Sequence, residues 1–373
     1  MRIMHNKIIA VILSIIIVIF TFIFVFKKNT EFSENENRYL QEVPKFSFSS
    51  LLKGTYIEKI EDYFADQFPF RDTFMSIKTK TDKLLGKKDI NDVYLGSNDY
   101  LIERYNAPAN SDKIIKTLNE FQEIVNYVNL NLMLVPTSIS INYDMLPNNV
   151  AYKSQMKELE YIYDNINFNT INVYDILIKQ NEYYQMYYRL DHHWTSYGAY
   201  YAYQEYCKAN NIDFLSINDF EIEEITRDFN GTLYSKSNDY SKKPDSIHLF
   251  TPKNNNYEVE YVYSNTKTDT LYELSYLEKK DKYSLFLDNN HPLIIVTNND
   301  IKNNNEIVII KDSYANSFVP FIVNHFKKVH VIDPRFYQEK ISEYIQNNKN
   351  IKDALILYNM NTIDKDVGVL TIK

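Results

Sequence analysis

The hydrophobic pattern begins with one unbroken apolar run that has no counterpart later in the chain. Ile8–Phe26 contains 19 residues, of which only Ser14 and Thr21 are even mildly polar. A helix of this length spans roughly 28 Å, about the hydrocarbon thickness of a bilayer. The run ends in Phe-Val-Phe-Lys-Lys and lacks the small residues of a signal-peptide cleavage site. The pattern therefore predicts a single-span, uncleaved membrane anchor within residues 1–28.

The basic residues that flank this run bear on how the predicted anchor is oriented in the membrane. Two basic residues precede it and two follow it, so the distribution of positive charge favours neither side. The very short N-terminal tail favours a cytoplasmic N-terminus with the large domain outside the cytoplasm. Residues 29–46 are polar and acidic and predict a tether, which leaves 47–373 as the extracytoplasmic domain.

Helix and strand patterns alternate along most of this domain. Residues 47–86 predict helices interrupted at Phe68–Arg71, and short strands follow at Asp92–Leu95 and Tyr100–Arg104. The further strands expected are Asn131–Pro136, Ile171–Ile176, Glu306–Ile310, Val329–Ile332 and Ala354–Tyr358, and the helices are one capped by Ser111, 152–165, Thr195–Ala209, Tyr314–Phe326 and Gln338–Gln346. This alternation predicts an α/β fold with a mostly parallel sheet covered by helices on both faces. Residues 213–300 are polar and weakly periodic, and predict a β-containing insertion.

Charge and cysteine usage restrict the function classes. The formal net charge is −8 and the isoelectric point is about 5.5, which makes a nucleic-acid partner unfavourable. Cys207 is the only cysteine, so the chain has no internal disulfide. An oxidising compartment permits disulfides without requiring them.

The run Asp191-His192-His193-Trp194 is the first candidate for chemistry. The chain has seven histidines and one tryptophan, and two of the histidines and the tryptophan stand here. A catalytic histidine needs a carboxylate at Nδ1 to hold its tautomer and stabilise the imidazolium, and Asp191 stands two residues before His193. The second candidate is Ser313, which follows the apolar strand Glu306–Ile310 and opens a predicted helix.

These two groups are expected at the carboxyl ends of strands, where ligands of open α/β sheets bind. Free backbone N–H groups at a helix start suit a developing oxyanion. Ser313 would attack, His193 would take its proton, and Asp191 would orient His193. Each residue also has a structural alternative, since Ser313 and Asp191 are common helix caps and His192 could simply pack or donate a hydrogen bond.

Five segments together resemble a known family. They are Arg189–Ala199 (RLDHHWTSYGA), Phe64–Asp72 (FADQFPFRD), Leu134–Thr137 (LVPT), Gly231–Ser237 (GTLYSKS) and Lys311–Tyr314 (KDSY). The chain resembles the bacterial DHHW proteins, which are similar to the alginate O-acetyltransferase group of SGNH-hydrolase-like proteins. The first segment is the specific one, and the others support it.

The resemblance implies a fold and an activity. The fold is an SGNH-type three-layer α/β/α sandwich on a membrane anchor. The activity is O-acetyl transfer onto an extracellular polysaccharide through a Ser-His-Asp triad without a cofactor or metal. The family motifs map onto Asp191, His193 and Ser313. A multi-spanning membrane-bound O-acyltransferase is implied as the partner that supplies acetyl groups.

The chain departs from the alginate group in one position of the motif. His192 stands where those enzymes have a polar residue other than histidine, so spacing selects His193 as the base. No oxyanion residue is secure by motif. Candidates for oxyanion or substrate binding are Tyr314, Asn316, Asn290, Arg335, His192 and Trp194. Arg335 could bind an acyl or sugar oxygen, or form a surface ion pair.

Three other functions remain open from the sequence. A carbohydrate esterase would use the same residues and differ only in whether water outcompetes the sugar. A non-catalytic polysaccharide-binding scaffold would retain the fold alone. A metal-dependent phosphoesterase would use Asp191, His192 and His193 as ligands. That last reading lacks a second Asp-x-Asp or His-x-His cluster at a strand end.

Overall fold

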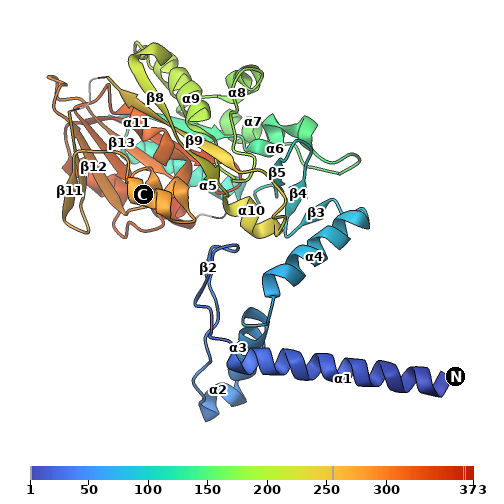
Figure 1. Ribbon diagram of the computed structural model, residues 1–373. Coiled ribbons are helices and arrows are strands. Elements are labelled where there is room, and N and C mark those ends of the chain that lie inside the picture. The colour runs from blue at the N-terminus through green and yellow to red at the C-terminus, as the bar shows by residue number, and fades with distance from the viewer. Residues whose placement is uncertain (1, 254–255, 364, 366) are drawn as a thin grey trace. The chain divides into compact units, whose positions relative to one another are not determined.

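The computed structural model describes residues 2–253, 256–363, 365 and 367–373 (Figure 1). The chain divides into two compact units. Unit 1 comprises the residues up to Lys87 together with Ser235–Ser241, and unit 2 comprises Lys88–Tyr234 and Lys242–Lys373.

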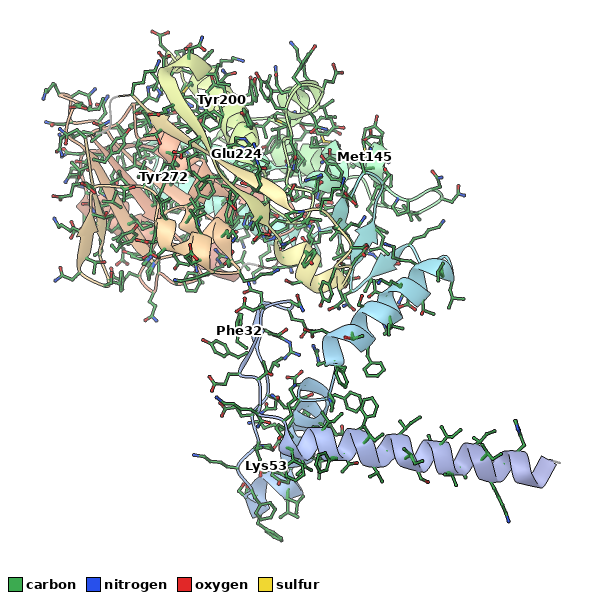
Figure 2. All side chains as sticks on the ribbon, in the orientation of Figure 1. Phe32, Lys53, Met145, Tyr200, Glu224 and Tyr272 are labelled. Carbon is green, nitrogen blue, oxygen red and sulfur yellow. The ribbon has the colours of Figure 1, made fainter. Side chains whose placement is uncertain are left out.

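Unit 1 is built from helices and one short hairpin. The helices are α1 (Arg2–Phe26), α2 (Phe48–Leu52), α3 (Thr55–Asp66) and α4 (Arg71–Leu84), and the hairpin pairs β1 (Phe32–Ser33) with β2 (Arg38–Tyr39). Within the described residues, α1 is the one helix long and apolar enough to cross a membrane, over His5–Phe26. Its side chains project outward without neighbours along most of its length (Figure 2). The predicted break falls between α3 and α4, where Phe70 takes a left-handed φ of 59°.

The core of unit 2 is an eight-stranded sheet. Its order is β11-β10-β12-β14-β13-β15-β6-β7, and the strands from β14 to β7 are parallel while β12, β10 and β11 are antiparallel. The strands are β6 (Asn129–Val135), β7 (Asn169–Thr170), β10 (Tyr257–Tyr261), β11 (Thr266–Thr268), β12 (Leu293–Asn298), β13 (Glu306–Lys311), β14 (Lys328–Ile332) and β15 (Ile351–Asn359). The predicted mostly parallel α/β fold is confirmed.

Alternate side chains of each central strand serve two different cores. Along β13, Ile307 and Ile309 join one apolar cluster, whereas Val308 and Ile310 join the other. The first cluster is closed by α8 (Tyr174–Gln180), α9 (Ser196–Ala209) and α11 (Val319–Ile322), and the second by α5 (Ser111–Ile124), α7 (Met156–Asp164) and α12 (Ile341–Asn347). Since both faces are covered, every residue of β13 is buried. The unit is therefore a three-layer α/β/α sandwich.

Smaller elements border this sandwich. A three-stranded sheet contains β3 (Asp89–Ile90), β4 (Val93–Leu95) and β5 (Leu101–Glu103), and a two-stranded sheet pairs β8 (Phe220–Phe229) with β9 (Asp245–Pro252). The remaining helices are α6 (Ser138–Ile141), α10 (Thr232–Ser237) and the 3-10 turns η1 (Tyr143–Met145), η2 (Ile217–Asp219), η3 (Leu274–Glu278), η4 (Lys282–Leu285), η5 (Ser313–Ser317) and η6 (Val367–Thr371). Within the region predicted as an insertion, β10 and β12 join the main sheet. The domain boundaries expected from the sequence remain predictions.

Three local predictions are wrong. The strand expected at Ile171–Ile176 is absent: the short β7 ends at Thr170, residues 171–173 form no strand, and α8 begins at Tyr174. The single helix expected at Tyr314–Phe326 is the 3-10 turn η5 followed by the short α11, because Pro320 lies at the beginning of α11 and lacks an N–H to continue the preceding turn. Asn110, not Ser111, occupies the cap position of α5, and the Ser111 hydroxyl donates to Glu158.

Candidate active site

The site forms at the edge of the sheet where three parallel strands end. Ile310 of β13 pairs with Ile332 of β14 and with Ile356 of β15. The residues that follow these positions therefore meet at one edge: Lys311–Ser313, Asp333–Arg335 and Asn359. The antiparallel β12 begins at the same edge, since Leu293 pairs with Ile332, so the loop before it also arrives there.

The structure brings Asp191, His193 and Ser313 into one hydrogen-bonded line. The Nδ1–H of His193 donates to Asp191 Oδ1 at 2.6 Å, and the ring's Nε2 lies 2.7 Å from Ser313 Oγ. Asp191 and His193 are buried, while Ser313 is partly exposed. A proton on Nδ1 leaves Nε2 as the acceptor for the serine hydroxyl, which is the arrangement of a general base poised on a nucleophile.

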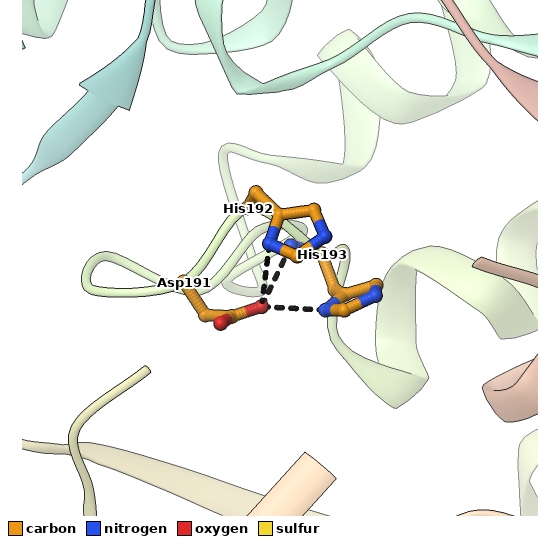
Figure 3. A group of neighbouring side chains, drawn as sticks. All are labelled: Asp191, His192 and His193. Atoms are coloured by element: carbon orange, nitrogen blue, oxygen red, sulfur yellow. Dashed lines mark hydrogen bonds and ion pairs between the residues drawn. The ribbon is translucent and has the colours of Figure 1, made fainter. Parts of the chain in front are cut away.

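Asp191 is held from two sides. Its Oδ1 also accepts the backbone N–H of His193 at 2.9 Å, and Figure 3 shows these contacts within the Asp191–His193 turn. Its Oδ2 accepts the backbone N–H and the hydroxyl of Thr232, at 2.8 and 3.0 Å. A Cβ added to Gly231 would lie 2.3 Å from the Cβ of Asp191, so only glycine allows this approach. Thr232 and Gly231 belong to the segment that supported the family resemblance, but no sequence pattern indicated a role for either.

Burial and charge set the protonation states of the pair. Burial works against charge on Asp191, yet the neighbouring His192 and His193 and the hydrogen bonds from His193 and Thr232 hold the pKa of this carboxyl well below its usual range. Burial, followed by the charge of His192, lowers the pKa of His193 to about 4, and Asp191 offsets only part of this effect. At neutral pH the pair is thus a carboxylate beside a neutral imidazole, the state a general base requires.

Tyr283 covers one face of the His193 ring. The two rings are stacked, with centroids 3.7 Å apart and planes 9° from parallel. The buried Tyr283 hydroxyl donates to the backbone carbonyl of Ser313 at 3.1 Å and lies 3.1 Å from Ser317 Oγ. Tyr283 therefore ties His193 to the turn that carries Ser313. Nothing in the sequence marked it, since it lies in η4, far from the other members of the site along the chain.

Trp194 and Tyr314 stabilise the site through hydrogen bonds made by their buried side chains. The Nε1–H of Trp194 donates to the carbonyl of Tyr314 at 2.9 Å and to Ser317 Oγ at 3.0 Å. The hydroxyl of Tyr314 donates to the carbonyl of His192. Both side chains are fully buried, so neither presents a surface to a polysaccharide in this conformation. The backbone N–H of Tyr314 donates to Asp312 Oδ1 at 2.9 Å and is already used.

His192 takes a position different from that of His193. Its Nδ1 lies 2.7 Å from the Thr232 hydroxyl, and its side chain is partly exposed. Asp191, His192 and His193 are the one group in the described ranges with the donor spacing for a metal ion. All three already hold one another or Thr232 through the same atoms, so metal ligation would have to break the triad line.

Lys311, two residues before Ser313, is a buried lysine. The ammonium of Lys311 donates to Asn316 Oδ1 at 2.7 Å and to Asn290 Oδ1 at 2.6 Å, and lies 3.3 Å from Asp333 Oδ2. Its side chain is 0% exposed, and burial lowers the pKa of its ammonium group. Because Lys311 binds the amide oxygen of Asn316, it also fixes the Nδ2 group, which donates to the carbonyl of Asn289 at 3.3 Å and to Asn290 Oδ1 at 3.2 Å. The predicted candidates Asn316 and Asn290 are therefore brought together around Lys311, which no sequence pattern marked as a site residue.

Asp333 and Asp312 are two further buried polar residues at this edge of the sheet. Asp333 Oδ1 accepts from Arg335 Nε at 2.8 Å and its Oδ2 accepts from the Arg335 guanidinium at 2.5 Å. Asp312 Oδ2 accepts the backbone and side-chain N–H groups of Asn359 at 2.8 and 2.7 Å. Burial raises the pKa of Asp312 to about 6. Arg335 is thus held by an ion pair yet remains open to solvent.

A model of the DHHW protein family matches residues 36–91 and 88–332 of this chain. Among solved structures, a DHHW family protein from Eubacterium siraeum superimposes with a TM-score of 0.66 at 23% identity, over 75% of this chain and 95% of that one. Bacillus cereus PatB1, solved with a sulfonyl adduct, superimposes with a TM-score of 0.62 at 19% identity, over 75% of this chain and 98% of that one. A search of curated proteins found no match. Because the family match extends over most of the chain, the protein belongs to the DHHW family.

Proposed function

We propose that this protein is a membrane-anchored serine O-acetyltransferase that acetylates a hydroxyl of an extracellular or cell-surface polysaccharide. The observation that carries the proposal is the line from Asp191 through His193 to Ser313, with contacts of 2.6 and 2.7 Å. A buried neutral imidazole between a carboxylate and an accessible serine is the arrangement used for acyl transfer. The acetyl chemistry comes from the family resemblance.

The first half-reaction acylates the enzyme. Ser313 Oγ attacks the carbonyl carbon of the acetyl donor while His193 Nε2 takes the hydroxyl proton. Collapse of the tetrahedral intermediate releases the donor's leaving group, which receives that proton from His193. The product is an acetyl ester on Ser313. Asp191 stabilises the transient imidazolium at Nδ1 without taking its proton.

The second half-reaction reverses these roles. A sugar hydroxyl loses its proton to His193 Nε2 and attacks the acetyl carbonyl of the serine ester. The proton then passes to Ser313 Oγ as the acetylated sugar departs. Water in place of the sugar would give hydrolysis, so esterase activity differs only in the acceptor.

The oxyanion of each tetrahedral intermediate needs hydrogen-bond donors near Ser313. Among the described residues the backbone N–H of Ser313 has no acceptor, which leaves it available. Asn316 follows one 3-10 turn later, so its side chain leaves the same face as Ser313. We assign the backbone N–H of Ser313 as one oxyanion donor. The Nδ2 group of Asn316 already donates to the carbonyl of Asn289 at 3.3 Å and to Asn290 Oδ1 at 3.2 Å, so it would serve as a second donor only by releasing one of these bonds. Arg335 is the candidate for contacting acceptor-sugar oxygens.

The anchor and partner belong to the same proposal. An uncleaved α1 with its N-terminus in the cytoplasm would hold Ser313 on the outer side of the membrane, where cell-surface polysaccharides lie. Acetyl groups would then have to cross the membrane, which is the task of the membrane-bound O-acyltransferase that the family resemblance implies. Asp191, His193 and Ser313 need no metal or organic cofactor for this chemistry.

The test uses cells in which the chromosomal gene is the only source of this protein. We expect replacement by Ser313→Ala to abolish O-acetyl groups on the polysaccharide that the wild type modifies, measured by alkaline release of acetate and by proton NMR of the purified polymer. Ser264→Ala, at an exposed serine between β10 and β11, is the matched control and should retain most acetylation. Higher acetylation in the Ser313→Ala strain would indicate the esterase instead. Unchanged acetylation with normal protein levels would indicate the non-catalytic scaffold.

A further inference from the structure

We propose that α3 and α4 rest on the lipid bilayer that α1 crosses, with their exposed apolar faces against acyl chains. The inference concerns unit 1 and is independent of the acetyl-transfer chemistry. It rests on α1 as a membrane-spanning helix.

The apolar residues of α3 fall on one stripe that continues into the turn after it. Ile57, Ile60, Phe64 and Phe68 follow one another at intervals of three or four, the spacing of a single helix face. Their exposure is high for such residues: Ile57 is 47% exposed, Phe64 52% and Phe68 42%. A comparable stripe in unit 2, on α5, is buried against the sheet, with Phe121 at 0%.

Helix α4, which follows the turn after α3, carries a similar exposed apolar stripe. Phe70, Phe74, Ile77 and Leu84 lie on one face of α4 and its entry, and their exposures are 60%, 45%, 52% and 88%. Lys78 and Lys80 are exposed on the same helix. Interfacial helices combine an apolar face with lysines whose heads reach back to water or to phosphate groups. A water-facing helix has no reason to expose two phenylalanines and two aliphatic residues on one stripe.

The contact with α1 identifies lipid as the covering material. Phe68 stacks on Phe20 of α1 with ring centroids 5.5 Å apart, and Phe64 stacks on Phe24 at 5.2 Å. Phe20 lies six residues before the end of α1, which places it roughly 9 Å along the helix axis from that end. Side chains that touch Phe20 must therefore share the apolar surroundings of the spanning segment.

An open groove of about 530 Å³ lies between α1 and the turn that joins α3 to α4. Its walls include Ile17, Phe20 and Phe24 from α1, Phe64 from α3, Phe68 from the turn that follows, and Phe74 from α4. Every wall residue except one threonine is apolar. A groove of this chemistry beside a spanning helix suits an acyl chain.

Two arginines and two carboxylates near the turn between α3 and α4 form ion pairs. The guanidinium of Arg38 donates to both oxygens of Asp66, at 2.9 and 2.5 Å, and that of Arg71 donates to Glu36 at 2.7 Å. Asp66 and Gln67 are buried although they adjoin the exposed Phe68. The polar groups thus satisfy one another, which reduces the cost of bringing this turn against the membrane.

Site-directed fluorescence on the full-length protein in phospholipid nanodiscs tests the proposal. Cys207 is the only native cysteine and is buried, so an NBD label reports on an introduced thiol. Labels at Phe70→Cys and Ile77→Cys probe the stripe. Asp72→Cys, on the opposite face of α4 and 51% exposed, is the matched control, and Ile16→Cys reports whether α1 is inserted.

We expect doxyl-labelled lipids to quench positions 70 and 77 at least about threefold more than position 72, while aqueous iodide does the reverse. Quenching of 70 and 77 by iodide as strongly as 72, with position 16 quenched by lipid, would overturn the proposal. Protection of 70 and 77 from both quenchers would also overturn it, because a protein surface would then cover the stripe. Failure of lipid to quench position 16 would remove the premise and the proposal with it.

Discussion

Asp191 controls His193 through a single oxygen. Oδ1 accepts both the backbone N–H and the ring Nδ1–H of His193, so the two-residue spacing fixes the position of the imidazole and its tautomer together. The other oxygen is held by Thr232. In the proposed mechanism, the acid–base pair is therefore positioned before substrate binds, which favours general-base catalysis.

The pH dependence follows from the state of His193. Burial and the charge of His192 lower the pKa of His193 to about 4, and only the neutral imidazole accepts a proton from Ser313. As pH rises through that value, the fraction of neutral base rises, so kcat/KM for an activated acetyl ester should increase and then stay level through neutral pH. Initial rates across an acidic-to-neutral series check this. An apparent pKa near that of free imidazole would contradict the assignment.

Thr232 offers a conservative test of the carboxylate's support. Thr232→Val keeps the shape and the backbone N–H donor but removes the hydroxyl bond to Asp191. We expect kcat to fall about tenfold with little change in KM, the effect of one lost hydrogen bond to a charged group. Thr232→Ser retains the hydroxyl and should stay within about twofold of the wild type. Equal activity of the valine and serine variants would show that the hydroxyl is not part of the machinery.

At the scale of elements, the site depends on two short 3-10 turns. Asp312 accepts the N–H of Tyr314 and so caps η5, which leaves Ser313 at the first position of the turn. η4 carries Tyr283 against both His193 and the carbonyl of Ser313. The two turns thus hold His193 and Ser313 at hydrogen-bond distance without a long helix.

Substitutions of Tyr283 separate its two contacts. Tyr283→Phe keeps the stacked ring and loses the hydroxyl bonds, so we expect a loss in kcat of only a few-fold. Tyr283→Leu removes the ring that holds the imidazole plane, and kcat should fall by about two orders of magnitude with KM nearly unchanged. Steady-state kinetics of both variants provide the comparison. A loss confined to KM, or one equal in both variants, would contradict a positioning role.

The sequence predicted elements where a local pattern determines them. Glu306–Ile310 and Ala354–Tyr358 are continuous apolar strands because both faces of the sheet are covered, and such runs are recognisable without the fold. β10 (YEVEY) alternates polar and apolar residues like any half-exposed strand, so nothing in its pattern tells which sheet it joins. Its place beside β12 depends on long-range pairing.

The same distinction applies to the candidate site. Asp191 and His193 are detectable because their pairing is local, and Ser313 because it follows a strand. Tyr283 and Lys311 had no such signal. Tyr283 reaches the site only because η4 lies beside η5 in space, and Lys311 looks like an ordinary strand-end residue until its three acceptors meet around it.

For the molecule as a whole, Lys311 links the site to the stability of unit 2. Its buried ammonium contacts Asn290 in the loop before β12, Asn316 in η5 and Asp333 directly after β14. Lys311→Met should destabilise the unit by about 3 kcal/mol, because Asn290, Asn316 and Asp333 lose a shared buried donor. Urea unfolding followed by the fluorescence of Trp194, the only tryptophan, measures this.

Lys267→Met is the matched control for that measurement. Lys267 is 53% exposed and pairs with Glu258 and Glu260 at the surface, so its loss should leave the unfolding midpoint nearly unchanged. Equal shifts in the two unfolding midpoints would contradict the central position of Lys311. A stable Lys311→Met variant with low activity would assign the lysine to catalysis alone.

The acyl-serine intermediate is the most direct test of the proposed function. Full-length protein is exposed to an activated acetyl ester, quenched in acid, digested and analysed by peptide mass spectrometry. We predict one acetyl group on the peptide containing Ser313, no adduct there in Ser313→Ala, and strongly reduced labelling in a folded His193→Ala variant. Absence of acetyl on Ser313, or equal labelling with and without His193, would contradict the account.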